Sequence, residues 1–311
     1  MEHRRIGILD NVSVIGLGCN NFGMTIDAAA TQQVVDAAIE AGITYFDTAE
    51  SYGQGQSEEF LGAALGARRD QVLVATKWGF TTGKDDLRGG DPKVIRTALE
   101  GSLKRLGMDY VDHYQLHRPD NQTAAAETLG CLAELQREGK IREIGCTHFT
   151  ADELGSSAAA ARDNGLPAYP SVQNHYSLLT RAVETNGVLE FCRANGVGFV
   201  PYFPLESGLL TGKYRAGEAR PEDSRLHRWG KRADAFIDDD KLATVARLTE
   251  WAEAKGHTML ELAMSYLASN PLVSTVIAGA TKPEQVRSNV AAASWAMTET
   301  ERAEVRALID G

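Results

Sequence analysis

The sequence predicts an α/β protein folded as a (β/α)8 barrel of the TIM type, in which eight parallel strands are enclosed by helices. Short β-rich runs alternate with helical patterns from about residue 12 onward, and this alternation indicates parallel pairing through right-handed crossovers. The chain has 311 residues, which is within the usual range for one such barrel. The elements are spaced too evenly to suggest a boundary, so we expect residues 1–311 to form a single domain.

The elements follow one another at regular intervals along the chain. We expect strands at residues 12–17, 44–46, 73–76, 111–116, 144–146, 171–173, 198–201 and 276–278, with helices that include residues 28–41, 58–65 and 127–137. Two further helices have recognisable starts. Asp91 is an N-cap followed by Pro92 at the first helical position, and Thr150 with Glu153 forms a capping-box pattern.

Two segments lie outside this repeat. Residues 5–9 and 12–14 flank Asp10-Asn11 and are typical of a β-hairpin, which we expect to plug the closed end of the barrel. Residues 204–240 form a long, charged loop after the seventh strand, and a connection of that length is usually functional or mobile. Its basic residues include Arg215, Arg220, Arg225, Arg228, Lys231 and Arg232. They favour a solvated flap over the alternative, a loop that closes over ligand phosphates.

The composition argues against several classes of function. The net charge of −10 is unfavourable for general binding to nucleic acid or to an anionic membrane. The start of the chain lacks the apolar core of a signal peptide, and no apolar run approaches the roughly 20 residues of a membrane span. The cysteines Cys19, Cys131, Cys146 and Cys192 show no CxxC pair and no nearby histidine cluster. We therefore expect a cytoplasmic protein without disulfides or a metal site.

Four polar residues stand where successive barrel strands should end, namely Asp47, Tyr52, Lys77 and His117. In a (β/α)8 barrel the C-terminal ends of the strands carry the chemistry, so neighbouring strand ends can bring these side chains together. Tyrosine is a poor acid, with a reference pKa of about 10, and a neighbouring ammonium lowers that pKa. A carboxylate beside the ammonium keeps it charged and in place. The set predicts a proton-transfer site.

Together with these residues, several motifs make the chain similar to the aldo-keto reductase family over nearly its whole length. The motifs are Phe46-Asp47-Thr48-Ala49-Glu50-Ser51-Tyr52-Gly53, Ala75-Thr76-Lys77, Gln115-Leu116-His117, and residues 139–145, 204–213 and 279–289. The resemblance implies an enzyme that reduces aldehydes or ketones to alcohols, or the reverse, by hydride transfer with NADP(H). Tyr52 would be the general acid/base, with its pKa lowered by Lys77 and with Asp47 holding Lys77. His117 would hydrogen-bond the carbonyl oxygen and orient the substrate.

The same resemblance implies the cofactor contacts. Thr147, His148 and Gln173 take the positions that hold the nicotinamide carboxamide, and Tyr202 takes the position that stacks on the nicotinamide ring. The further contacts implied are Cys19, Asn20, Asp47, Phe203, Leu205, Ser207, Lys213, Gly279, Thr281, Lys282, Gln285 and Asn289. No GxGxxG motif opens a helix after the first strand, so a Rossmann site is not supported.

The start of the last barrel helix bears on the choice of cofactor. A helix N-terminus attracts anions, and Lys282 would add the charge needed by an adenosine 2′-phosphate. A plain capping box from Thr281 to Glu284 is the alternative interpretation. Phosphate binding is favoured, so NADP(H) is expected rather than NAD(H), although this stretch lacks the arginine that many family members carry.

Two further expectations concern the pocket. His148 departs from the asparagine usual in the family, and its reference pKa of about 6.5 predicts that it titrates between about pH 7.5 and 5.5. Asn20 and Asn21 follow the first strand and would make the pocket floor polar. The residues expected to form or wall the substrate pocket are Trp78, Phe22, Phe203, Tyr52 and His117. The expected partner is a small carbonyl or alcohol substrate.

Two other function classes stay open beside the reductase. A channel β subunit resembles this fold and keeps a cofactor site while acting through partners, although we expect the short N-terminus to leave no room for an inactivating segment. A (β/α)8 glycosidase needs two carboxylates about 5–10 Å apart. Only Glu50 is available beside Asp47, which disfavours the glycosidase.

Overall fold

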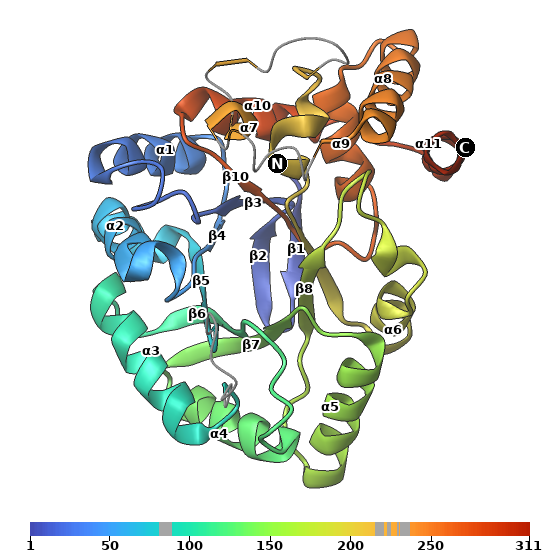
Figure 1. Cartoon of the computed structure of the whole chain (residues 1–311). Helices are drawn as coiled ribbons and strands as arrows, with labels where there is room; N and C mark the ends of the chain where they lie inside the picture. Colours follow the sequence, from blue (N-terminus) through green and yellow to red (C-terminus); the bar gives the residue numbers. More distant parts are fainter. Residues whose placement is uncertain (81–88, 215–220, 223–224, 229, 231–236) are drawn as a thin grey trace.

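Eight parallel strands close into a barrel, as the sequence predicts, in the order β10-β3-β4-β5-β6-β7-β8-β9. The computed structural model describes residues 1–80, 89–214, 221–222, 225–228, 230 and 237–311. The barrel strands are β3 (Ile15–Gly18), β4 (Tyr45–Asp47), β5 (Leu73–Trp78), β6 (Val111–Leu116), β7 (Ile141–Thr147), β8 (Ser171–His175), β9 (Gly198–Tyr202) and β10 (Val276–Gly279). Figure 1 looks into the barrel and shows the helices as a ring around the strands.

The helices occupy nearly the ranges that the sequence predicts. The helices of the repeat are α1 (Ala28–Glu40), α2 (Gln56–Leu65), α3 (Pro92–Leu106), α4 (Ala125–Arg137), α5 (Ala151–Asn164), α6 (Val188–Asn195), α9 (Met259–Ala268) and α10 (Pro283–Ala292). Additions are α7 (Arg225–Arg228), α8 (Asp239–Ala254) and α11 (Glu299–Asp310), and the short helical turns η1 (Tyr52–Gly55), η2 (Gly66–Gln71), η3 (Ala182–Glu184) and η4 (Glu206–Thr211). Both predicted caps are confirmed, because Asp91 accepts the N–H of Lys93 and Thr150 forms a capping box with Glu153.

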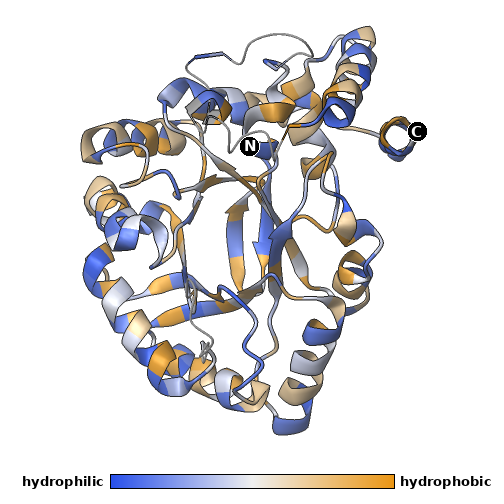
Figure 2. Cartoon of the chain, viewed as in Figure 1, coloured by the Kyte–Doolittle hydropathy of each residue, from blue (hydrophilic) through white to orange (hydrophobic). Residues whose placement is uncertain are grey.

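The main core lies between the barrel and its helices. Helix α1 buries Val34, Val35 and Ala38, and helix α3 buries Ile95 and Leu99 in the same core. Apolar residues three or four positions apart lie on one face of a helix, which is why these helices pack on the sheet. Hydrophobic and hydrophilic residues accordingly alternate along the outer ribbons in Figure 2.

The N-terminal hairpin is present, but its turn lies elsewhere than predicted. Strand β1 (His3–Ile6) pairs antiparallel with β2 (Leu9–Ser13), and Ile6 lies opposite Leu9. The turn is therefore at Gly7-Ile8 and not at Asp10-Asn11. Gly7 has a φ of 52°, a left-handed conformation that glycine adopts without steric penalty. The first barrel strand consequently begins only at Ile15.

This hairpin fills one end of the barrel. The side chains of Ile6 and Leu9 are buried in a second core that includes Tyr45 of the barrel. The backbone N–H of Ile8 donates a hydrogen bond to Oε2 of Glu143 over 2.9 Å. Both strands of the hairpin are visible inside the ring of barrel strands in Figure 1. The expected plug is thus confirmed, and it leaves the opposite end, where the barrel strands finish, for the site.

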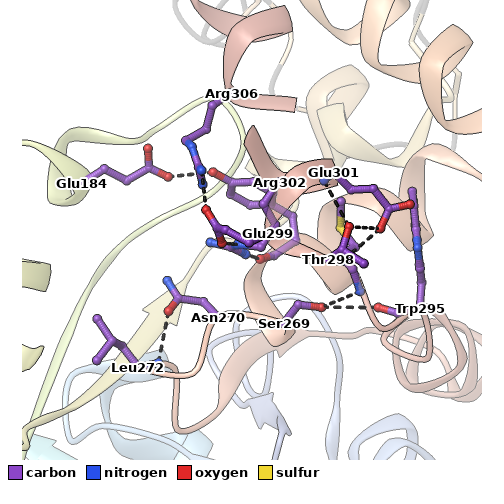
Figure 3. A network of polar contacts seen from close by, with 12 residues as sticks. Glu184, Ser269, Asn270, Leu272, Trp295, Thr298, Glu299, Glu301, Arg302 and Arg306 are labelled. Carbon is purple, nitrogen blue, oxygen red and sulfur yellow. Dashed lines mark hydrogen bonds and ion pairs between the residues drawn. The ribbon is translucent and has the colours of Figure 1, made fainter. Parts of the chain in front are cut away.

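The C-terminal helix α11 docks outside the barrel through polar contacts (Figure 3). Thr298 and Glu301 form a capping box at its start. Arg302 is buried and donates to the carbonyl oxygen of Tyr266 in α9. Ser269, just beyond α9, donates to the carbonyl oxygen of Trp295 over 3.4 Å. The contacts of α11 therefore stabilise the fold at a distance from the strand ends.

The long connection after β9 is only partly described. Arg215, Arg220, Lys231 and Arg232 lie outside the described residues, and Arg225 and Arg228 bound the short helix α7, so the solvated flap stays a prediction. Within the described part of the chain, no helix is both long and apolar enough to cross a membrane. There too, no group of three or more His, Cys, Asp or Glu side chains is placed to hold a metal ion. All four cysteines are buried and unpaired.

Candidate active site

A buried ion pair lies under the open end of the barrel. Asp47 ends β4 and Lys77 lies near the end of β5, where its Nζ donates to Asp47 Oδ2 over 2.6 Å and to the carbonyl oxygen of Thr48 over 3.0 Å. The Lys77 side chain is fully buried. Burial lowers the pKa of Lys77, but Asp47 and Tyr52 together outweigh burial and raise the pKa above its ordinary value, so the ammonium stays charged. The predicted pairing of these two residues is thus present.

Two amides fix the other oxygen of Asp47. Gln115 of β6 donates to Asp47 Oδ1 over 3.1 Å, and Gln173 of β8 donates to the same atom over 3.3 Å. Sequence reasoning quoted Gln115 only as part of a motif and gave it no role. Gln115 lies beside Lys77 in the strand register, which is the signal that could have placed it. Because both oxygens are engaged, the carboxylate has one orientation.

Tyr52 opens the turn η1 directly above this ion pair. The Lys77 ammonium lies 5.2 Å from the centroid of the Tyr52 ring, and the ring meets His117 edge-on at 5.8 Å between centroids. Burial raises the pKa of Tyr52, Lys77 lowers it, and on balance it stays above the ordinary value of a phenol. Lys77 therefore opposes the effect of burial. The phenol is in its acid form at neutral pH.

His117 follows β6 and completes the cluster. Its side chain is buried, and burial lowers its pKa to about 2, with the positive charge of Lys77 as a further cause. The imidazole is therefore neutral at physiological pH. Its Nδ1 is buried and has no hydrogen-bond partner within the described residues. A buried, unsatisfied ring nitrogen is costly unless a bound molecule supplies its partner.

One cavity of about 290 Å³ joins these groups to most of the expected nicotinamide contacts. It is lined by Gly18, Asn20, Asp47, Tyr52, Phe80, His117, Arg118, His148, Gln173, Tyr202, Phe203, Ile277 and Gly279. Sequence reasoning missed Gly18, Phe80, Arg118 and Ile277. Arg118 follows His117 directly, so its place beside the site was open to prediction, whereas that of Phe80 depends on the path of the loop after β5.

Trp78, Phe22 and Cys19 are among the expected site residues that do not line this cavity. The side chains of Trp78, Phe22 and Cys19 are fully buried in the core. Successive strand residues point to opposite faces, so Trp78 points toward the helices because Lys77 points into the barrel. Trp78 stacks on Tyr114 with 4.2 Å between ring centroids, and its Nε1 donates to the carbonyl oxygen of Gly89. In this structure Trp78 and Phe22 are therefore packed in the core and do not wall the cavity, and the cofactor contact expected at Cys19 stays a prediction.

The predicted titration of His148 is also wrong. Its φ is 63°, and its backbone N–H donates to the carbonyl oxygen of Gln173 over 3.0 Å, which directs the ring into the cavity. Burial lowers the pKa of His148 to about 4, and the positive charge of Arg118 is the next cause. The ring is therefore neutral between pH 5.5 and 7.5. Its Nδ1 lies 3.4 Å from the hydroxyl oxygen of Tyr202.

A partly buried carboxylate organises the loop after β9. Glu206 Oε1 accepts hydrogen bonds from His175 over 2.9 Å, from Ser177 over 2.5 Å and from Thr180 over 2.7 Å. His175 stacks on the ring of Tyr202 with 5.3 Å between centroids. Burial raises the pKa of Glu206, but these hydrogen bonds outweigh burial and hold the pKa below its ordinary value. Sequence reasoning missed this cluster, because its members come from the end of β8, the loop after it and the turn η4.

The remaining expected cofactor residues are not among those that line this cavity. Thr147 is buried at the end of β7 and donates to the carbonyl oxygen of His117. Leu205 and Ser207 are partly buried beside or within η4, Lys213 is exposed just beyond it, and Asn289 is buried in α10. The alternative capping box from Thr281 to Glu284 is not formed. Instead, Lys282 is the N-cap of α10 without a side-chain hydrogen bond, and Thr281 donates to Gln285 Oε1 over 2.8 Å.

Comparison with known proteins agrees with this architecture. The Aldo/keto reductase family model matches residues 14–310. The chain is 34% identical to an L-glyceraldehyde 3-phosphate reductase of Escherichia coli over 284 residues, which covers 88% of this chain and 81% of that protein. It is 37% identical to a probable voltage-gated potassium channel subunit beta of Oryza sativa over 278 residues, which covers 87% and 84%.

A solved structure gives the same result. The glycerol dehydrogenase of Gluconobacter oxydans superposes with a TM-score of 0.82 at 28% sequence identity, over 98% of this chain and 94% of that one. The family model covers nearly the whole barrel, including every strand end that contributes to the cavity. The chain therefore belongs to the aldo/keto reductase family of carbonyl oxidoreductases.

Proposed function

We propose that this protein is an NADP(H)-dependent reductase of aldehydes or ketones, or an alcohol dehydrogenase in the reverse direction, with Tyr52 as the general acid/base. The observation that supports this most directly is the arrangement at the cavity. The phenol of Tyr52 and the neutral ring of His117 face it together. The Lys77–Asp47 pair lies behind them.

Each of these residues has a definable task in the proposed reaction. In reduction, the O–H bond of Tyr52 breaks and its proton goes to the substrate carbonyl oxygen. The phenolate that remains is stabilised by the charged ammonium of Lys77, which Asp47 keeps in place. His117, being neutral, donates one hydrogen bond to the same oxygen and orients the carbonyl group. Proton transfer from a positioned group contributes about 10²–10⁴ in rate.

The residues around the cavity fit a nicotinamide cofactor. When bound, the reduced nicotinamide supplies the hydride. Gln173 donates to Asp47 through its amide nitrogen, which leaves its amide oxygen to accept a hydrogen bond from a carboxamide. Thr147 and His148 would hold the same carboxamide, and Tyr202, with one face on His175, would stack on the nicotinamide ring. The residues proposed to run along the pyrophosphate are Leu205, Ser207 and Lys213.

The preference for NADP(H) is supported by the start of α10. Lys282 is exposed and lacks a side-chain cap. Although Pro283 has no N–H and the N–H of Gln285 donates to the carbonyl oxygen of Lys282, the positive end of the helix dipole favours an anion there. The ammonium of Lys282 would add charge for a 2′-phosphate. Gln285 and Asn289 lie on the same helix and complete the proposed adenosine end. The buried, unpaired thiols support the proposal that the protein works in the reducing cytoplasm.

Turnover on a panel of aldehydes and ketones with NADPH and NADH tests this function directly. We expect reduction of several members, with a larger kcat/KM for NADPH than for NADH. A protein that binds NADPH but turns over no carbonyl compound would favour the regulatory alternative suggested by the potassium channel subunit. Family membership argues against the glycosidase alternative, and Asp47 is already paired with Lys77.

A further inference from the structure

Arg118 lines the cavity but has no part in the steps above. It follows His117 at the end of β6, and its side chain is exposed at the cavity mouth. The central guanidinium carbon lies 5.1 Å from the centroid of the Phe80 ring. Phe80 in turn lies against the His117 ring, with 4.8 Å between centroids. Phe80 thus connects the position of Arg118 to the position of the ring that would orient the carbonyl.

The N–H groups of Arg118 are free to bind a ligand in the described structure. Within the residues described, Arg118 makes no hydrogen bond and no ion pair to a side chain or the backbone, and its contact is the ring of Phe80. An aromatic ring attracts a guanidinium without consuming its five N–H donors. A planar fork of donors is the group that best matches a carboxylate or a phosphate.

Arg118 carries the positive charge that is not offset among the residues that line the cavity. Asp47 is compensated by Lys77, and the rings of His117 and His148 are neutral at pH 7. The charge of Arg118 is felt inside the cavity, because it is one of the causes that lower the pKa of both histidines. An anionic group held at the mouth would meet this charge while a carbonyl at the other end of the same molecule reaches Tyr52.

We propose that Arg118 binds an anionic group of the substrate, a carboxylate or a phosphate, so that the enzyme prefers carbonyl compounds that carry such a group. This inference rests on the proposed reductase function and names its substrate class. The guanidinium is exposed in the free protein, so its contribution falls between that of a surface ion pair and that of a buried charge-assisted contact. We therefore expect a preference of about five- to fiftyfold.

Steady-state kinetics on matched aldehydes test this assignment. The substrates are 3-carboxybenzaldehyde, 4-carboxybenzaldehyde, 4-formylphenyl phosphate and the methyl ester of 4-carboxybenzaldehyde as the neutral reference. Arg118→Gln should lower kcat/KM for the anionic members about five- to fiftyfold more than that of the ester. The kcat/KM of Arg118→Lys for the anionic substrates should lie between those of the wild type and Arg118→Gln, because lysine keeps the positive charge but lacks the planar set of N–H donors. The acids and the phosphate ester separate the two possible anionic groups.

Controls separate this result from general damage. Arg137→Gln removes the same charge from the exposed side of α4, outside the cavity, and should change no substrate ratio. The Kd of NADPH for Arg118→Gln should equal that of the wild type. Equal kcat/KM losses for the ester and the anions, or no loss for any anion, overturn the assignment.

The reductase function and the role of Arg118 can fail separately. If no aldehyde is turned over at all, the proposed function fails. Calorimetric binding of 4-carboxybenzaldehyde and of its ester to the NADP⁺ complex, in wild type and Arg118→Gln, then decides the role of Arg118. Tighter binding of the acid that depends on Arg118 supports the anion site, and equal binding of acid and ester contradicts it.

Discussion

Burial determines the charge of the two histidines that face the cavity. His117 has its pKa lowered to about 2 and His148 to about 4, in each case first by burial. Both reference values are about 6.5, so neither charge state follows from residue type. A neutral His117 can donate a hydrogen bond to a carbonyl oxygen without adding a charge that would compete with Lys77.

The lowered pKa of His148 changes what pH should do to cofactor binding. Protonated His148 would repel the cationic oxidised nicotinamide and leave the neutral reduced form almost unaffected. The ratio of NADP⁺ to NADPH affinity should therefore stay constant from pH 7.5 to 5.5 and fall only as the pH approaches about 4. Fluorescence titration of both nucleotides from pH 7.5 down through about pH 4 measures this ratio.

In His148→Asn the ratio of NADP⁺ to NADPH affinity should no longer fall at low pH. In His3→Asn, a control on the exposed hairpin, the ratio should fall as in the wild type. A ratio that already changes around pH 6.5 in the wild type would show that the ring titrates near its reference value. It would also mean that the His148 ring is better hydrated in solution than its buried position in the structure indicates.

At the scale of elements, the loop after β9 is held in an unusual conformation by one carboxylate. Phe203, Glu206 and Ser207 have positive φ values of 53°, 46° and 56°, a backbone region that residues other than glycine rarely adopt. Such strain persists only where surrounding contacts enforce it. Glu206 supplies those contacts through His175 and its two hydroxyl donors.

Glu206→Ala should therefore weaken NADPH binding about tenfold, because the loss of hydrogen bonds to a charged group releases the loop that would follow the pyrophosphate. The Kd of NADPH from fluorescence titration measures this effect. Glu190→Ala, on the exposed face of α6, is the matched control and should leave Kd unchanged. An unchanged Kd in Glu206→Ala would mean that the loop conformation does not depend on its carboxylate.

The start of α10 is the element that should distinguish the two cofactors. Lys282→Ala should weaken NADPH binding roughly ten- to a hundredfold and leave NADH binding nearly unchanged, since only NADPH carries the 2′-phosphate. Titration of both nucleotides provides the comparison, with the exposed Lys93→Ala on α3 as the control. Equal losses for NADPH and NADH would point to damage to the helix start.

At the scale of the whole molecule, stability and chemistry are placed at opposite ends of the barrel. Glu143 is buried and accepts the N–H groups of Ile8 and Ile144, which ties the hairpin to β7. Glu143→Ala should lower the free energy of unfolding by about 1–3 kcal/mol, because the buried N–H of Ile144 and the partly buried N–H of Ile8 lose their acceptor. Urea unfolding measures this loss, and the exposed Glu138→Ala should lose much less.

The affinity for NADPH of folded Glu143→Ala should equal that of the wild type, since the hairpin lies at the other end of the barrel. A loss of affinity as large as the loss of stability would show that the two ends of the barrel are coupled. That result would contradict the separation of stability from chemistry.

Local patterns were sufficient for the barrel and for most of its site. The alternation of strands and helices, the cap at Asp91 and the strand-end positions of Asp47 and Lys77 are features of short segments, and the structure shows each of them. The hairpin turn was misplaced because Asp10-Asn11 is as good a local turn signal as Gly7-Ile8. Its register is set by distant contacts such as that of Glu143.

The direction of a strand side chain could have been predicted better. Because Lys77 points into the barrel, Trp78 must point outward, and this alternation would have removed Trp78 from the expected pocket walls. The meeting of Arg118 with Phe80 and the pKa of His148 could not be predicted in this way. Both depend on how loops from separate strands pack around the cavity.

The central claim is that Tyr52 gives its proton to the substrate. The most direct test is the single-turnover rate of NADPH oxidation by an aldehyde that the wild type reduces well, measured for Tyr52→Phe. The rate should fall about 10²–10⁴-fold, while the Kd of NADPH stays unchanged, because the variant loses only the phenol oxygen. Tyr110→Phe, which lies against Arg69 away from the cavity, should keep the wild-type rate. A rate for Tyr52→Phe close to that of the wild type would contradict the account.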